Sequence, residues 1–175
     1  MKRVLALSLV VLSLISSAPA SQAMGSGNKY SDLQTGVTYG IYQPSNTLGL
    51  PVLNFEVRPC RLFPKKDMYL LAGFGGMDRG IALVETAAAF NCTGVDNPVS
   101  LGTTMINGIK AQVGIYCASK SCPASKFSQY GGEITWTTPK TKTLAATYIR
   151  LGTQGGFTLQ QLTAFATGLK LVGKK

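Results

Sequence analysis

The sequence contains no histidine, and only 7 of its 175 residues are acidic. Histidine is the commonest general base in enzymes and a frequent zinc ligand, so its absence excludes most hydrolase designs and most zinc sites. A hydrolase based on paired carboxylates would need two acids facing each other across a cleft. Glu56, Glu85 and Glu133 lie on expected strands and are the candidates for that chemistry. We interpret them as solvent-facing charges and predict that the protein is not an enzyme.

The sequence also lacks an apolar segment long enough to cross a bilayer, which takes roughly 20 residues. The most apolar segment, Val4–Ile15, spans 12 residues. Lys2 and Arg3 precede it, and small residues ending in Ser21-Gln22-Ala23 follow, an order typical of a secretory signal peptide. We predict a signal peptide over residues 1–23, cleaved after Ala23, with residues 18–20 as the competing site. The mature protein is then secreted, without a membrane anchor or an acylated cysteine.

Four cysteines in an exported chain indicate two disulfides. Cys117 and Cys122 enclose four residues, enough for a tight loop, which leaves Cys60 to pair with Cys92. A zinc site and a catalytic dithiol are the alternatives. Both are disfavoured, because the sequence has no Cys-x-x-Cys pair and no histidine to complete a metal site.

Apolar and polar residues alternate with a period of two through most of the mature chain, as expected for half-buried strands. Residues 24–36 are polar and glycine-rich and are expected to form a flexible leader. Asn107-Gly108 predicts a type I′ hairpin turn, because both residues tolerate a positive φ. Gly73-Phe74-Gly75-Gly76 is interpreted as a hairpin turn and not as a phosphate-binding loop, since a strand follows it. The expected strands cover residues 37–42, 52–58, 68–74, 81–86, 104–106, 109–117, 133–137 and 144–151.

Near the C-terminus the period changes to that of a helix. Thr158 and Gln161 have the spacing of a capping box, and Phe157 and Leu162 that of a hydrophobic staple. A helix of about three turns is therefore expected from Thr158 to Lys170, with one apolar face. Together these patterns predict a single α+β domain over residues 37–175. Its curved, antiparallel, meander-like sheet has about seven strands, with one C-terminal helix packed on it and two disulfides.

Two sets of residues are candidates for binding. A gap between the curved sheet and the helix would form an apolar pocket lined by Tyr39, Phe55, Tyr69, Trp136, Tyr148, Leu162 and Phe165. Without Lys2 and Arg3, the chain has 15 basic and 7 acidic residues, which gives a net charge of +8. The candidate anion-binding residues are Arg58, Arg61, Lys65, Lys66, Lys120, Lys126, Lys140 and Lys142. No cofactor and no metal are expected.

Several short strings in the mature chain resemble small exported domains of unknown function from Gram-positive, especially actinobacterial, bacteria. The strings are Gly36-Val37-Thr38-Tyr39, Tyr42-Gln43-Pro44, Phe55-Glu56-Val57-Arg58-Pro59-Cys60, Asn107-Gly108-Ile109-Lys110-Ala111, Tyr116-Cys117, Ile134-Thr135-Trp136 and Leu162-Thr163-Ala164-Phe165-Ala166-Thr167-Gly168-Leu169. The resemblance implies a sheet-plus-helix fold distantly similar to lipoprotein-carrier and envelope-stress sensor domains, which bind lipids or lipoproteins. It brings no catalytic residues.

We therefore expect a secreted, non-catalytic binding or sensing module of the bacterial cell envelope, with a lipid or another apolar molecule as its ligand. The alternative is a basic protein that attaches electrostatically to an anionic wall polymer or to nucleic acid. A carboxylate-based hydrolase is the third option. A lipid or envelope component, or an anionic polymer, is thus the expected partner.

Overall fold

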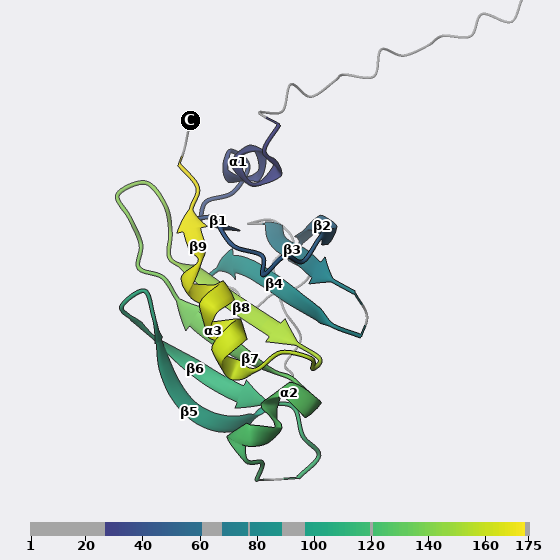
Figure 1. Cartoon of the computed structure of the whole chain (residues 1–175). Coiled ribbons are helices and arrows are strands. Elements are labelled where there is room, and N and C mark those ends of the chain that lie inside the picture. Colours follow the sequence, from purple (N-terminus) through teal and green to yellow (C-terminus); the bar gives the residue numbers. More distant parts are fainter. Residues whose placement is uncertain (1–26, 61–67, 77, 89–96, 120, 174–175) are drawn as a thin grey trace, which may run out of the picture.

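The computed structural model describes residues 27–60, 68–76, 78–88, 97–119 and 121–173. The predicted signal peptide, Cys92, Arg61, Lys65, Lys66 and Lys120 lie outside these ranges. A seven-stranded antiparallel sheet dominates the fold, with the strand order β2-β3-β4-β8-β7-β6-β5 (Figure 1). Its strands are β2 (Val52–Pro59), β3 (Met68–Gly75), β4 (Gly80–Ala87), β5 (Val99–Ile106), β6 (Ile109–Ile115), β7 (Gly132–Thr137) and β8 (Thr147–Thr153).

Two shorter groups of elements complete the described chain. A two-stranded ribbon pairs β1 (Tyr42–Pro44) with β9 (Leu169–Leu171). The helical elements are α1 (Lys29–Gln34), η1 (Ala124–Lys126), α2 (Phe127–Tyr130) and α3 (Leu159–Thr167). Among the described helices, none is long and apolar enough to span a membrane.

The seven-stranded sheet consists of two meanders that meet in its middle. Strands β2, β3 and β4 follow one another in space as in sequence, and so do β5, β6, β7 and β8. The meanders join through antiparallel pairing of β4 with β8, where Val84 lies opposite Arg150. The α+β class, the antiparallel sheet and the C-terminal helix are thus confirmed.

The Asn107-Gly108 turn is present as predicted. A second hairpin joins β3 to β4, but Gly73, Phe74 and Gly75 belong to β3 and not to its turn, which comes later than predicted. In the β5–β6 turn Asn107 has φ 48° and Gly108 has φ 81°, as a type I′ turn requires. In the β3–β4 hairpin Gly75 lies opposite Gly80 and has φ 89°. A Cβ atom at Gly75 would lie 2.3 Å from the Arg79 carbonyl oxygen, so only glycine fits there.

Helix α3 begins as predicted but ends earlier. The Gln161 amide donates to Thr158 Oγ1 at 3.2 Å and the Thr158 amide donates to Gln161 Oε1 at 3.0 Å, which completes the capping box. The helix ends at Thr167 and not at Lys170. Gly168 follows it and accepts a hydrogen bond from the Ser45 amide at 2.9 Å, and Lys170 then pairs with Gln43 in the β1–β9 ribbon. Backbone pairing to a distant segment therefore replaces the last helical turn.

The first and last expected strands begin and end later than predicted, since β1 ends at Pro44 instead of residue 42 and β8 ends at Thr153 instead of residue 151. Tyr39 forms only an isolated bridge with Ala145, so β1 begins at Tyr42 instead of residue 37. Strand β8 begins at Thr147 instead of residue 144. Conversely, β5 begins at Val99, before the expected residue 104. Alternation alone marks inward-facing residues but does not reveal where a partner strand begins.

Part of the expected leader over residues 24–36 is helical and packed on the domain. The Asn28 side chain caps α1 by accepting from the Tyr30 and Ser31 amides. Tyr30 and Gln34 are buried. The Gln34 side chain donates to the Tyr39 carbonyl at 2.8 Å and accepts from the Ile41 amide at 2.7 Å. Residues 28–36 therefore belong to the folded domain.

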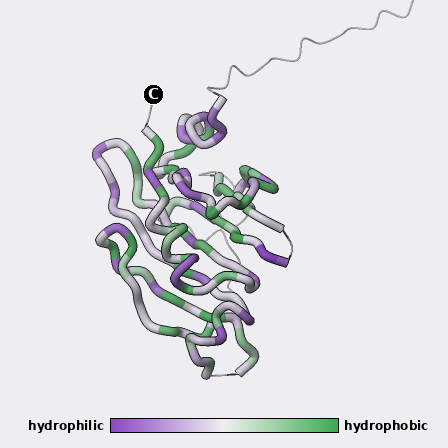
Figure 2. Tube along the Cα trace, in the orientation of Figure 1, coloured by the Kyte–Doolittle hydropathy of each residue, from purple (hydrophilic) through white to green (hydrophobic). Residues whose placement is uncertain are grey.

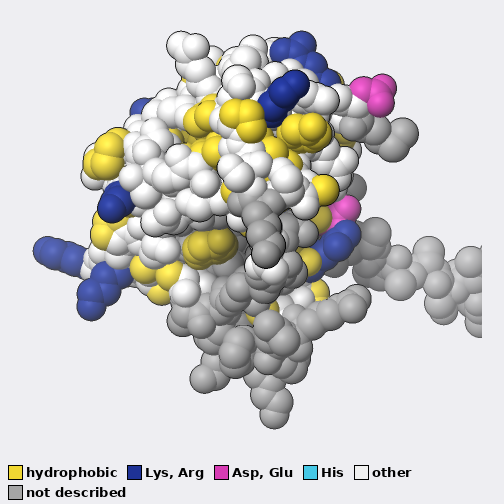
Figure 3. Space-filling view, turned by 90° about the horizontal axis from the view of Figure 1, so that it is seen from below, with side chains coloured by type: hydrophobic (Ala, Val, Ile, Leu, Met, Phe, Trp, Pro, Cys, Tyr) yellow, Lys and Arg dark blue, Asp and Glu magenta, His cyan; other side chains and the backbone are white. Residues whose placement is uncertain are grey.

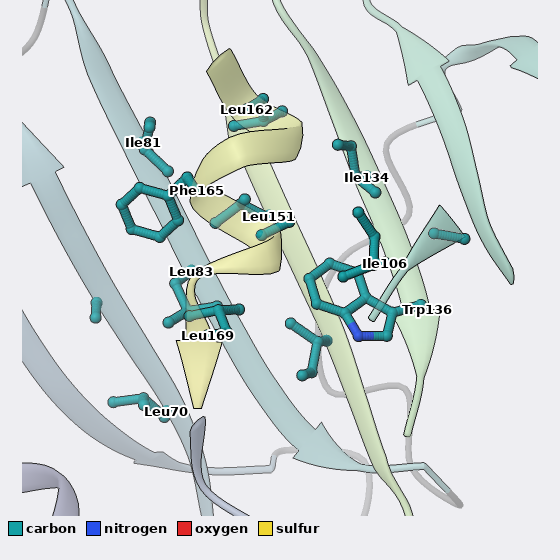
Figure 4. Close-up of a cluster of buried hydrophobic side chains, with 14 of the residues drawn as sticks. Leu70, Ile81, Leu83, Ile106, Ile134, Trp136, Leu151, Leu162, Phe165 and Leu169 are labelled. Carbon is teal, nitrogen blue, oxygen red and sulfur yellow. The ribbon is translucent and has the colours of Figure 1, made fainter. Parts of the chain in front are cut away.

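The core lies between α3 and one face of the sheet (Figure 4). Phe165 packs edge to face on Phe74, with 5.1 Å between ring centroids. Hydrophobic residues recur along the strands and along α3 in Figure 2. The core side chains of α3 and of the strands beneath it are fully buried or nearly so, and they include Ile81, Leu83, Ile134, Trp136, Leu151, Leu162 and Phe165.

The structure shows the predicted Cys117–Cys122 disulfide, which closes the loop before η1. Cys60 is fully buried and is not a free thiol. Its expected partner, Cys92, lies outside the described residues. One disulfide is therefore established, and the Cys60–Cys92 pairing stays a prediction.

Candidate functional site

The face of the sheet opposite α3, here called the outer face, differs in character from the face that forms the core. In β8, Ile149 and Leu151 are buried in the core, whereas Arg150 and Gly152 alternate with them and so face the other way. In β7, Glu133 alternates with Ile134 in the same manner. The outer face therefore carries charged and small side chains.

A row of small residues crosses three strands of the outer face. Gly73 in β3 lies opposite Ala82 in β4, and Ala82 lies opposite Gly152 in β8. Because these residues have almost no side chain, the face is hollowed beside them, with a cavity volume of about 390 Å³, although the Asn54 side chain occupies the space directly over Gly73. This outer-face hollow is also lined by Leu53, Tyr116 and Arg150.

A closed network of hydrogen bonds borders the hollow. The Tyr116 hydroxyl donates to Glu133 Oε2 at 2.6 Å, and Arg150 Nε donates to the same oxygen at 2.6 Å. Arg150 Nη2 also donates to the Tyr116 hydroxyl oxygen at 3.1 Å. The Arg150 and Glu133 side chains are only 15% and 11% exposed. The three groups hold one another in position at the edge of the cavity.

The network gives the cavity wall no net charge but leaves it able to form hydrogen bonds. Arg150 and Glu133 form an ion pair, so their charges cancel at the cavity wall. Burial raises the pKa of Tyr116, and the hydrogen bond to Glu133 raises it further. Tyr116 is therefore protonated at neutral pH and remains a hydrogen-bond donor.

The structure does not gather the residues of the predicted apolar pocket around one cavity. Tyr39, Trp136, Leu162 and Phe165 are core residues, at most 5% exposed. Phe55 packs edge to face on Tyr30, with ring centroids 4.9 Å apart. Tyr69 and Tyr148 belong to the outer face, since they lie opposite Arg58 and Thr86. None of these seven side chains is among the described residues that line the outer-face hollow.

The described basic candidates do not form one patch. Arg58 pairs with Glu56 within β2. Lys126 ends η1, just before the start of β7, whereas Lys140 and Lys142 follow the end of β7. A six-residue strand is about 20 Å long, so these lysines lie at opposite ends of the sheet. Lys and Arg side chains are likewise scattered over the face shown in Figure 3.

The three candidate carboxylates do not form a catalytic pair. Glu85 shares the core face with Ile81 and Leu83, whereas Glu133 is on the outer face. Glu56 is on the outer face too, but β2 and β7 are four strand spacings apart in the sheet, or about 19 Å. Retaining and inverting glycosidases need separations of roughly 5 to 10 Å. These three residues therefore cannot act together as a glycosidase would require.

Interpreting all three glutamates as solvent-facing charges was wrong for Glu85 and Glu133. Glu85 is fully buried, and burial raises its pKa well above the usual range. Its Oε2 accepts from the Tyr42 amide at 3.0 Å, and its Oε1 has no hydrogen-bond partner. Glu85 lies two residues from Leu83 and four from Ile81 in the same strand, so its side chain faces the core as theirs do. This alternation is the feature of the sequence that indicates a buried position.

The network of Tyr116, Glu133 and Arg150 was not predicted from the sequence. Neither Arg150 nor Tyr116 was among the candidate binding residues. The parity of Arg150 against Ile149 and Leu151 does indicate an outward-facing charge. Its partners come from β6 and β7, so the network becomes visible only once the strand order is known.

Comparisons of the chain with family models, with curated proteins and with solved structures found no match. The outer-face hollow and its hydrogen-bonding wall are therefore the basis for a functional conclusion.

Proposed function

We propose that the protein is an exported, non-catalytic binding module that holds a small, uncharged, hydroxyl-rich ligand in the outer-face hollow. The observation that carries this proposal is the combination of a row of small residues with a charge-neutral hydrogen-bonding wall. Residues 1–23, with the order of a secretory signal, support export to the cell envelope.

The dimensions and lining of the hollow support a ligand such as a saccharide unit. A volume of about 390 Å³ is at the small end of the range for ligand sites. Leu53 and Ala82 offer apolar surface for the C–H face of a sugar ring, while Tyr116 and Arg150 offer polar groups for its hydroxyls. The cancelled charges of Arg150 and Glu133 disfavour a strongly charged ligand.

A lipid ligand, expected from the sequence, has less support. The predicted lipid pocket lies beneath α3, where Leu162 and Phe165 are fully buried in the core. For this reason we place the ligand on the opposite face of the sheet.

The proposal is tested by filling the hollow. Ala82 is exposed, so Ala82→Leu adds bulk to the hollow without entering the core. The matched control is Ala164→Leu, the same change at an exposed position of α3. Mature wild-type protein is titrated by calorimetry with a panel of neutral mono- and disaccharides, including N-acetylglucosamine.

We expect saturable binding of at least one sugar, at least a tenfold weaker Kd for Ala82→Leu, and an unchanged Kd for Ala164→Leu. Binding should also be insensitive to salt, whereas attachment to an anionic polymer through the +8 charge weakens steeply as salt is added. The absence of binding across the panel, or equal Kd values for wild type and Ala82→Leu, contradicts the proposal.

We further propose that the exported form contains a second disulfide, between Cys60 and Cys92. The buried, bonded state of Cys60 supports it. A disulfide closing a loop of this length contributes roughly 3 to 4 kcal/mol in chain-entropy estimates. Peptide mapping without reduction should recover a Cys60–Cys92 cross-linked peptide, and recovery of alkylated Cys60 or Cys92 instead disproves the pairing.

A further inference from the structure

Strand β2 forms one edge of the seven-stranded sheet (Figure 1). On its far side, no strand among the described residues pairs with it. It also carries exposed apolar side chains, with Val52 52%, Leu53 61% and Val57 37% exposed. An edge strand of this kind presents unpaired backbone donors and acceptors to another chain.

Two opposite charges stand two residues apart on the same side of β2. Arg58 Nε donates to Glu56 Oε2 at 2.7 Å, and both side chains are exposed. When an antiparallel strand pairs with β2, residues that lie directly opposite each other share a face of the sheet and come within contact distance. When two copies of β2 pair, some registers therefore place Glu56 of one copy opposite Arg58 of the other, which is favourable. Other registers place like charges opposite each other, which is unfavourable.

We propose that two copies of this chain associate through antiparallel pairing of β2 with β2, about a two-fold axis at Val57. In this register Glu56 of each copy lies opposite Arg58 of the other, so four charges of alternating sign meet on one side of the ribbon. The inference goes beyond the proposed ligand-binding function and does not depend on it.

Neighbouring registers lack this complementarity. A two-fold axis at Glu56 places two glutamates face to face, and an axis at Arg58 does the same with two arginines. An axis at Phe55 places Glu56 opposite Asn54 and leaves Arg58 opposite the apolar Val52. Of these registers, only the one centred on Val57 pairs both charges with opposite charges.

A single pair of edge strands makes a small interface, which belongs to the weak class of associations. The interaction should therefore appear only at high protein concentration. Because the charge pairs are exposed, added salt should weaken it.

The test uses charge reversal at each position, with the mature protein studied by sedimentation velocity from about 10 µM to about 1 mM. We expect wild type to form a concentration-dependent dimer. Glu56→Lys and Arg58→Glu should each weaken the dimer at least tenfold, because each places like charges opposite one another at both ends of the register.

An equimolar mixture of the two variants should restore the dimer. In the mixed pair, the lysine introduced at position 56 faces the glutamate introduced at position 58, while the native Arg58 faces the native Glu56. Weakening by both single variants is specific to the Val57-centred register, because no other register above places Glu56 opposite Arg58. Restoration in the mixture shows that the weakening comes from repulsion between like charges and not from a loss of folding.

The controls are Asp78→Lys and Lys142→Glu, which make the same changes in net charge at exposed positions outside β2. Both should dimerise as wild type does, and circular dichroism should show that all four variants remain folded. A wild type that is monomeric at 1 mM, variants that dimerise like wild type, or a mixture that stays monomeric overturns the proposal.

Discussion

The two faces of the seven-stranded sheet are made of the same strands but bury their side chains differently. The core face carries large apolar residues that pack against α3 and fill the space beneath it. The outer face has Gly73, Ala82 and Gly152 in a row, and there the surface is hollow. Strand alternation is the same on both faces, so the size of the side chains decides which one leaves room for a ligand.

The two faces also differ in how they hold a buried carboxyl group, as Glu133 and Glu85 show. Glu133, on the outer face, is held by Tyr116 and Arg150 at 2.6 Å from each. Glu85, on the core face, has one hydrogen bond from the Tyr42 amide and no basic partner among the described contacts. A carboxyl group on the outer face is stabilised as an ion pair, whereas on the core face burial favours the neutral acid.

The largest expected effect comes from opening a cavity on the core face. Phe165 is fully buried against Phe74, so Phe165→Ala should destabilise the protein by roughly 3 to 5 kcal/mol. Chemical denaturation monitored by Trp136 fluorescence measures this. Gln160→Ala, an exposed position of the same helix, is the control and should change stability by less than about 0.5 kcal/mol. Similar losses in the two variants would mean that α3 does not cover the core.

On the outer face, the ion pair can be broken from one side. Arg150→Met should cost roughly 3 kcal/mol, because it leaves Glu133 largely buried without its positive partner. Adding Glu133→Gln should recover part of the loss, since the unpaired charge is then removed. Urea denaturation of the single and double variants gives the comparison. A double variant less stable than Arg150→Met would contradict this account of the pair.

The buried glutamate of the core face predicts a pH dependence. The pKa of Glu85 is raised in the folded protein, so at pH values above about 4.3 the unfolded chain has released a proton that the fold retains. The contribution of Glu85 to stability therefore falls as pH rises from about 4.3 through the folded pKa. Glu85→Gln cannot ionise and should lose less stability than wild type between pH 5 and pH 9, as urea denaturation would measure. Equal losses would show that Glu85 is ionised in the fold.

The smallest effect is expected where α3 begins. Thr158→Ala removes the side-chain cap on the Gln161 amide and should cost about 1 kcal/mol. Thr158→Ser keeps the hydroxyl and serves as the control. Thermal unfolding should rank the stabilities as wild type, then Ser, then Ala. A Ser variant no more stable than the Ala variant would show that the hydroxyl does not cap the helix.

The sequence predicted local structure well, because local structure depends on neighbouring residues. The Asn107-Gly108 turn and the Thr158 cap each require only a few adjacent residues to adopt one conformation. The predicted end of α3 was wrong because the true end depends on a distant segment, through the pairing of Lys170 with Gln43. Likewise, Asn28 and Tyr30 look like part of a leader until their contacts with the domain are known.

The candidate site was less predictable than the fold. The outer-face hollow depends on Gly73, Ala82 and Gly152 becoming neighbours, although they are spread over 80 residues of the chain. Its wall needs Tyr116, Glu133 and Arg150 from three strands. Their strand parity indicates a face but not a partner, so only the strand order reveals the site.

The pairing of β4 with β8 also determines the order in which the sheet can be completed. As the chain is made from its N-terminus, β2, β3 and β4 are available long before β8, which begins 60 residues after the end of β4. During that interval β4 is an open edge in the middle of the future sheet. Contacts of such high sequence separation form slowly, and open edges invite aggregation. The junction between the meanders is thus a step at which nascent chains of this protein are vulnerable to misassembly.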